Sequence, residues 1–177
     1  MKNIVLLISS LMIISCGGGG GGGGSTPTSP STGLTSSFNA VTPAVGSNYV
    51  KMEQVSASVD TVTIAVKAVS IAEPVGGMAL DVSYDTSKLS YVSATNGDVI
   101  SGNTSSFVAT DSSGTVIISA SDVTDASPSS NGTLFTITLK GVSTGAGSVG
   151  LANGSLFNAS GGSIRGISWY GGTVAVQ

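Results

Sequence analysis

Strict alternation of apolar and polar residues dominates the sequence after residue 38 and constrains the fold more than any other feature. The apolar members of the five clearest runs are Val62, Ile64 and Val66; Leu80, Val82 and Tyr84; Val116 and Ile118; Phe135, Ile137 and Leu139; and Val174 and Val176. No stretch carries apolar residues at helical spacing for more than about two turns. Because successive side chains of a strand point to opposite faces, the pattern predicts strands with one buried and one solvent-facing side.

Clusters of turn-forming residues separate these runs and limit the length of each strand. Asp85-Thr86-Ser87, Asn96-Gly97-Asp98 and Gly161-Gly162-Ser163 are examples. Such residues accept positive φ or bond their own backbone, so they end strands. The spacing predicts about nine short strands within residues 38–177, arranged as one antiparallel sandwich of two stacked sheets. The predicted fold class is therefore all-β.

The first sixteen residues have the pattern of an export signal. Lys2 supplies a positive start, residues 4–14 form an apolar run, and Cys16 is the only cysteine. A run of this length is shorter than a transmembrane helix needs and is typical of a signal peptide. The sequence Ile13-Ile14-Ser15-Cys16 resembles the lipobox of bacterial lipoproteins, which implies cleavage before Cys16 and acylation of that residue. Attached lipid would then hold the exported protein in a bilayer, at the outer membrane or cell surface. An ordinary secretory signal is the alternative.

The composition of residues 16–37 predicts a tether between this anchor and the folded domain. Eight consecutive glycines at residues 17–24 are followed by a segment rich in Ser, Thr and Pro. Neither part has enough apolar surface to offset the entropy lost on ordering. We therefore expect a flexible linker that ends where the domain begins, at Phe38.

Composition excludes several classes of function. The chain has no histidine and one cysteine, so it cannot build a Ser-His-Asp or Cys-His nucleophilic site, a His-ligated metal site or a thiolate zinc cluster. Its formal net charge of −3 argues against nucleic-acid binding. The aspartates follow no calcium-loop pattern such as D-x-D-x-D-G, and most fall in turns, where Asp is favoured for backbone reasons. We expect no catalytic residues, no metal site and no cofactor in this chain.

Four segments resemble, in order and spacing, the strands of cohesin domains. They are residues 77–89 with the turn Tyr84-Asp85-Thr86-Ser87-Lys88-Leu89, residues 91–100 with Asn96-Gly97-Asp98, residues 131–141, and residues 171–176. Thr86 stands where the family usually has proline. The resemblance covers roughly Tyr49 to Gln177 and implies a jelly-roll sandwich of about nine strands, a fold shared with one group of carbohydrate-binding modules.

The cohesin resemblance implies a binding function. Cohesins bind dockerins, which are small calcium-loaded helical modules, on one flat sheet face. The chain would thus be a non-catalytic module that docks a dockerin-containing protein, in polysaccharide degradation or cell-surface assembly, with the calcium on the partner. By position, the implied binding residues are Gly77, Ala79, Asp81, Ser83, Ser119 and Asp122. Asp122 matches a position that is often acidic, whereas Gly77 and Ala79 replace polar residues of type I cohesins. For Ala79, Asp81, Ser83 and Ser119, the alternative is the plain solvent-facing side of a sheet.

Direct carbohydrate binding is the alternative function. Aromatic rings in a planar row grip flat glycan surfaces, and the candidates here are Trp169 and Tyr170. Adjacent residues of a strand point to opposite sides, so at most one of the two could join a platform. Tyr84 and Tyr91 are predicted to lie in the core. A third alternative is a structural or adhesion subunit of the cell envelope.

Overall fold

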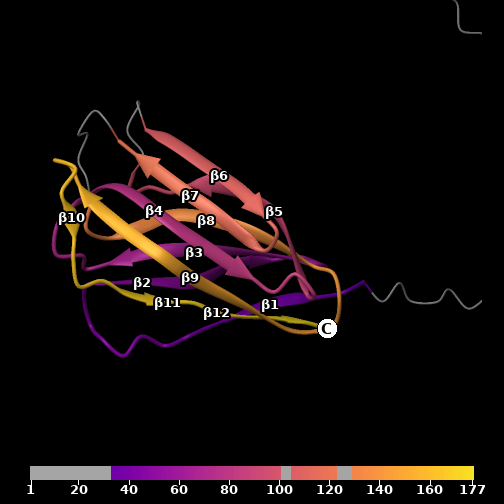
Figure 1. The fold of residues 1–177 in the computed structure, drawn as a ribbon. Helices are drawn as coiled ribbons and strands as arrows, with labels where there is room; N and C mark the ends of the chain where they lie inside the picture. The colour runs from indigo at the N-terminus through magenta and orange to yellow at the C-terminus, as the bar shows by residue number, and fades with distance from the viewer. Residues whose placement is uncertain (1–32, 101–104, 123–128) are drawn as a thin grey trace, which may run out of the picture. The chain divides into compact units, whose positions relative to one another are not determined.

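Two facing β-sheets form the domain in the computed structural model, which describes residues 33–100, 105–122 and 129–177 (Figure 1). The described residues contain twelve strands and no helix, and hence no helix able to span a lipid bilayer. The strands are β1 (Ser36–Ala40), β2 (Tyr49–Ala57), β3 (Thr61–Val69), β4 (Val75–Tyr84), β5 (Leu89–Asn96), β6 (Ser106–Ser112), β7 (Thr115–Ser121), β8 (Gly132–Gly141), β9 (Gly145–Asn158), β10 (Ser163–Ile164), β11 (Ser168–Tyr170) and β12 (Gly172–Val176).

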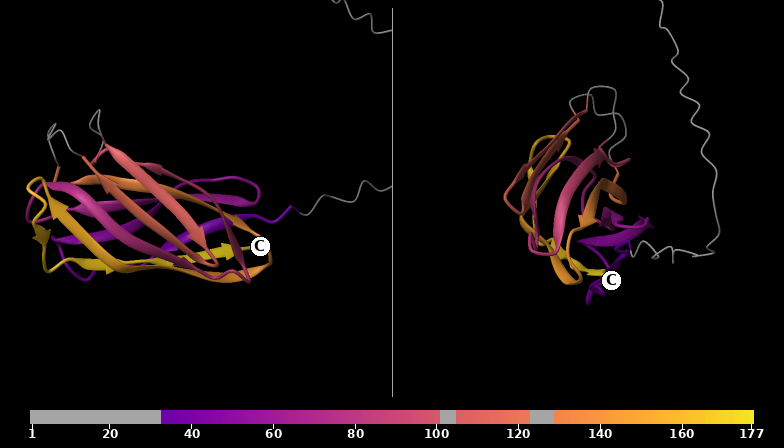
Figure 2. Two further views of the ribbon diagram at one scale, coloured as in Figure 1. Left: turned by 45° about the horizontal axis from the view of Figure 1, so that its top comes forward. Right: turned by 90° about the vertical axis from the view of Figure 1, so that its right-hand side faces the viewer.

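The strand order confirms the predicted sandwich. The larger sheet has seven strands, in the order β1-β12-β9-β4-β7-β6 with β10 paired to β9, and the smaller sheet has five, in the order β11-β2-β3-β8-β5. The two layers are visible in Figure 2. Neighbouring strands are antiparallel except β11 and β2, which are parallel. The structure has more strands than the nine predicted, partly because β10 and β11 span only two and three residues. Alternation cannot be recognised in segments that short.

The apolar residues of the alternating runs form the core between the sheets. Ile64, Ile118 and Phe135 are fully buried, and each core-side residue named above for the five runs has an exposed fraction of 9% or less. Burial of apolar surface, at about 25 cal/mol per Å², is the main force that holds the sheets together. Tyr84 keeps its polar end satisfied, because its hydroxyl donates to Asp111 Oδ1 at 2.9 Å. The pKa of Tyr84 is raised, mainly because the side chain is buried and also because the Asp111 carboxylate lies beside its hydroxyl.

The chain enters the domain beside its own C-terminus. β1 pairs with β12, and Thr35 and Gln177 exchange two backbone hydrogen bonds of 2.8 and 2.9 Å. β1 and β12 accordingly lie side by side in Figure 1. The first strand begins at Ser36, two residues before the predicted start at Phe38. Ser36 is buried, and its hydroxyl donates to the Asp60 carbonyl at 3.2 Å. Because Ser36 is polar, a search for alternating apolar residues does not include it in the strand.

Candidate binding face

β4 carries four of the predicted binding residues. Ala79 and Ser83 are exposed and Asp81 is half-buried, and all three alternate with buried Leu80 and Val82. Their side chains therefore point away from the core, on the outer surface of the larger sheet. Gly77 belongs to the same side of the strand but is buried.

β7 brings the remaining predicted residues next to β4. The register pairs Ala79 with Ser119, and Gly77 with Ser121. Asp122 follows directly after β7, and its backbone N–H donates to the Gly76 carbonyl at 2.9 Å. The structure thus gathers the six predicted residues at neighbouring positions of one sheet.

β6 and β9 extend this surface on either side. We call it the small-residue face, and it consists of Gly77, Ala79, Asp81 and Ser83 of β4, Ser106, Val108, Thr110 and Ser112 of β6, Thr115, Ile117, Ser119 and Ser121 of β7, and Ser155 and Phe157 of β9. Among these residues only Asp81 is charged. Val108 and Ile117 are 56% and 51% exposed. A surface of this kind offers apolar contacts and hydrogen bonds rather than ion pairs.

A bulge in β9 places an amide beside Asp81. The register between β4 and β9 shifts between Ala79 and Asp81. Asn153 lies in this irregular part of β9 with a φ of 51°, a conformation that Asn tolerates better than most residues. Its Nδ2 donates to Asp81 Oδ2 at 2.6 Å. This bond orients the one carboxylate of the small-residue face.

A hollow of about 450 Å³ opens at one end of the face, where β4 begins and β7 and β9 end. Three predicted residues, Gly77, Ser119 and Asp122, line it together with Phe157. Phe157 is paired with Gly77, and its side chain lies within van der Waals reach of that position. Sequence reasoning missed Phe157, because it reaches Gly77 only through pairing of β9 with β4 and no local pattern marks it.

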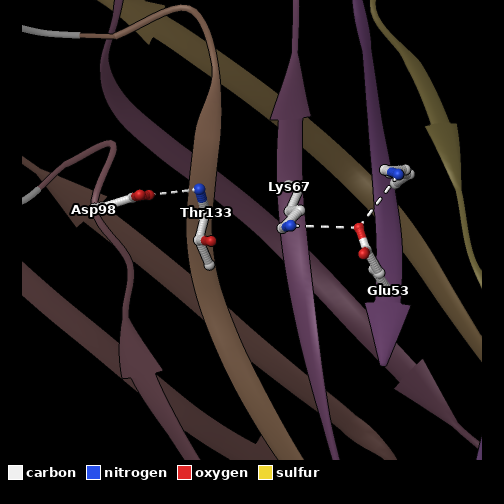
Figure 3. Close-up of polar contacts among 5 residues, drawn as sticks. Glu53, Lys67, Asp98 and Thr133 are labelled. Carbon is white, nitrogen blue, oxygen red and sulfur yellow. Dashed lines mark hydrogen bonds and ion pairs between the residues drawn. The ribbon is translucent and has the colours of Figure 1, made fainter. Parts of the chain in front are cut away.

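The outer surface of the smaller sheet differs by carrying paired charges. Glu53 Oε2 lies 3.3 Å from the Nζ atoms of both Lys51 and Lys67 (Figure 3), and Lys140 Nζ lies 3.1 Å from Asp60 Oδ2. The ammonium groups of Lys51 and Lys67 hold the pKa of Glu53 below its ordinary value. Exposed pairs of this kind add at most about 1 kcal/mol to stability. The two outer surfaces of the sandwich therefore differ in charge.

The two predicted glycan-binding aromatics lie on β11 of the smaller sheet and are not part of the small-residue face. Trp169 packs against the core, and a methyl group at Gly154 would lie 2.4 Å from its ring. Tyr170 contacts Tyr49 edge to face, with ring centroids 5.9 Å apart and planes at 89°. The Tyr170 hydroxyl accepts the Ala44 N–H at 3.3 Å. These contacts do not bring Trp169 and Tyr170 into a coplanar row.

Among the residues that the structure describes, no three or more His, Cys, Asp or Glu side chains lie together where they could hold a metal. Asp98 instead accepts the N–H of Thr133 and closes a turn against β8 (Figure 3). Cys16, the predicted acylation site, lies outside the residues that the structure describes.

Fold and face together define an all-β sandwich module whose candidate site is the outer surface of its larger sheet. Residues 49–163 match the cohesin domain family, which is more than half of the chain. The chain belongs to the cohesin family. No curated protein sequence matches it.

Solved cohesin structures share its fold. A non-cellulosomal cohesin from Archaeoglobus fulgidus is 17% identical with a TM-score of 0.53, over 77% of this chain and 88% of that one. The second type II cohesin module of the adaptor scaffoldin ScaA from Acetivibrio cellulolyticus is 17% identical with a TM-score of 0.62, over 71% and 94%. The sixth cohesin of scaffoldin B from the same organism, solved in complex with a dockerin, is 17% identical with a TM-score of 0.55, over 78% and 97%.

Proposed function

We propose that this cohesin is a non-catalytic module that docks a dockerin-bearing protein on the small-residue face. Membership of the cohesin family supports this proposal, as does the dockerin complex of the scaffoldin B cohesin. The observation that carries it is the gathering of Gly77, Ala79, Asp81 and Ser119 on one partly apolar sheet surface with a single charged side chain. The module would act in polysaccharide degradation if the docked protein carries an enzyme, or in cell-surface assembly if it carries a structural partner.

Val108 and Val92 provide a matched pair that tests which face docks. They are 56% and 50% exposed, and they lie on β6 of the larger sheet and β5 of the smaller sheet. Val108→Asp is expected to weaken dockerin binding by roughly tenfold or more, because a second carboxylate would be desolvated in an interface with little charge. Val92→Asp is expected to leave the affinity unchanged.

Isothermal titration calorimetry of the purified protein checks this, with each dockerin module encoded in the same genome as the probe. Chelation of calcium should abolish binding, because we expect the ion on the dockerin. Equal affinity of the two variants would move the docking site off the small-residue face. Failure of every calcium-loaded dockerin to bind, with retention on insoluble cellulose or chitin in the presence of chelator, would favour the carbohydrate alternative.

We further propose that acylated Cys16 anchors the protein in a bilayer and that residues 16–37 tether the domain to it. Cys16→Ala in the producing cell is expected to move the protein from the membrane fraction to the soluble fraction. The variant lacks the proposed attachment point for lipid, and stable anchoring needs more than one lipid chain. Fractionation and mass spectrometry of the N-terminal peptide measure this, with Ser25→Ala in the tether as control. Retention of Cys16→Ala in the membrane fraction would contradict the proposed anchor.

A further inference from the structure

The hollow at the end of the small-residue face has backbone on part of its lining and an aromatic ring beside it. Gly77 contributes only backbone, the side chain of Ala120 is buried in the core, and Phe157 lies beside them. A methyl group at Gly77 would lie 3.4 Å from the Ala120 carbonyl oxygen and 3.7 Å from Phe157 Cβ, both ordinary contacts. The missing side chain of Gly77 therefore leaves usable space, and a residue larger than alanine at this position would fill it.

Three polar side chains at the rim, Ser106, Ser121 and Asn158, are hydrogen-bonded within the protein. Ser106 Oγ and Ser121 Oγ lie 3.1 Å apart and share a hydrogen bond. Asn158 Oδ1 accepts the N–H groups of Ser160 and Gly162 at 3.1 and 2.8 Å, and its Nδ2 donates to Glu73 Oε2 at 2.7 Å. These hydrogen bonds hold the rim in place and use part of its capacity to bind the hydroxyls of a sugar. The side chain of Phe157 beside the space over Gly77 favours a group that binds by apolar contact.

The hollow is continuous with the small-residue face, because Gly77, Ser119 and Ser121 belong to both. We propose that it takes one bulky apolar side chain, aromatic or leucine-like, that the dockerin presents as an anchor; this inference rests on the proposed function. An anchor in a desolvated hollow contributes far more to affinity than the surrounding flat contacts. The hollow thereby selects dockerins that carry a large apolar residue at the matching position.

The first experiment examines the hollow in the free protein. Nuclear magnetic resonance titrations use 4-methylphenol and indole, the side-chain analogues of Tyr and Trp, and in parallel glucose and N-acetylglucosamine. The analogues are expected to shift the backbone amide signals of Gly77, Ser119 and Phe157, and the sugars are expected to leave them unchanged. Shifts by the sugars alone, or by none of the four compounds, would overturn the inference.

The second experiment fills the hollow. Gly77→Leu is expected to weaken dockerin binding by about 30-fold or more, the loss typical of a removed anchor, whereas Gly77→Ala should stay within about threefold. Ser148→Leu adds the same side chain at an exposed outward position of β9, far from the hollow, and serves as the matched control. Thermal unfolding of each variant verifies the fold.

The outcomes separate the two proposals. Unchanged affinity of a folded Gly77→Leu variant would overturn the apolar anchor and leave dockerin docking intact. If the unmodified protein binds no dockerin, the proposed function fails, and the titration with side-chain analogues still decides whether the hollow accepts an apolar group. The same titration decides the matter if Gly77→Leu does not fold.

Discussion

Replacement of Gly97 by alanine is expected to lower the free energy of unfolding by about 3 kcal/mol. A methyl group at this position would lie 1.9 Å from the Thr133 carbonyl oxygen and 2.7 Å from the Leu134 carbonyl carbon. The backbone cannot move aside cheaply, because the Gly97 N–H donates to Leu134 O and the Asp98 N–H to Thr133 O, each at 2.9 Å. Relief of the overlap would break the hydrogen bonds that join this turn to β8.

Gly46→Ala is the matched control for this substitution. No atom lies within 4 Å of the position that its methyl group would take, and Gly46 does not need a positive φ. Urea denaturation should therefore show a change of at most about 0.5 kcal/mol for Gly46→Ala, and a much lower midpoint with an unchanged slope for Gly97→Ala. Two variants of similar stability would mean that the contact with Thr133 does not constrain the turn.

The part of the fold that sequence could predict is the part with local periodicity. Val62, Ile64, Phe135 and Ile137 alternate with polar residues and are fully buried as predicted. β9 shows the limit of this reasoning, since its fourteen residues include several glycines and a bulge and so lack a continuous apolar alternation. Its position in the centre of the larger sheet depends on long-range pairing with β4 and β12, which leaves no local mark.

In the candidate site, too, the residues of a single alternating strand could be predicted, and those placed by long-range pairing could not. The outward positions of Ala79, Asp81 and Ser83 follow from the alternation of one strand, and the structure places them as that alternation predicts. The hollow beside Gly77 could not be predicted, because Phe157 and Asn158 reach it from the end of β9. The Asp81–Asn153 hydrogen bond depends on the same strand, so a pattern confined to one segment cannot reveal it.

Trp169→Ala is expected to lower the free energy of unfolding by about 3 kcal/mol. Retention of the protein on insoluble polysaccharide is expected to stay the same. The indole packs against the core and lies over Gly154, whose lack of a side chain provides the room for it. The adjacent Tyr170 ring is turned into an edge-to-face contact with Tyr49 rather than into a flat row. The surface of the indole is therefore used to cover β9, and its removal leaves a cavity.

Trp169→Phe is the control, because a smaller ring still covers Gly154 and should recover much of the lost stability. Chemical denaturation measures the stability of both variants, and retention on insoluble cellulose and chitin measures binding. A Trp169→Ala variant that stays within about 1 kcal/mol of the unmodified protein and loses retention would identify the indole as a glycan-binding ring. The carbohydrate alternative would then gain direct support. Loss of stability alone assigns Trp169 to the core and leaves the small-residue face as the proposed docking surface.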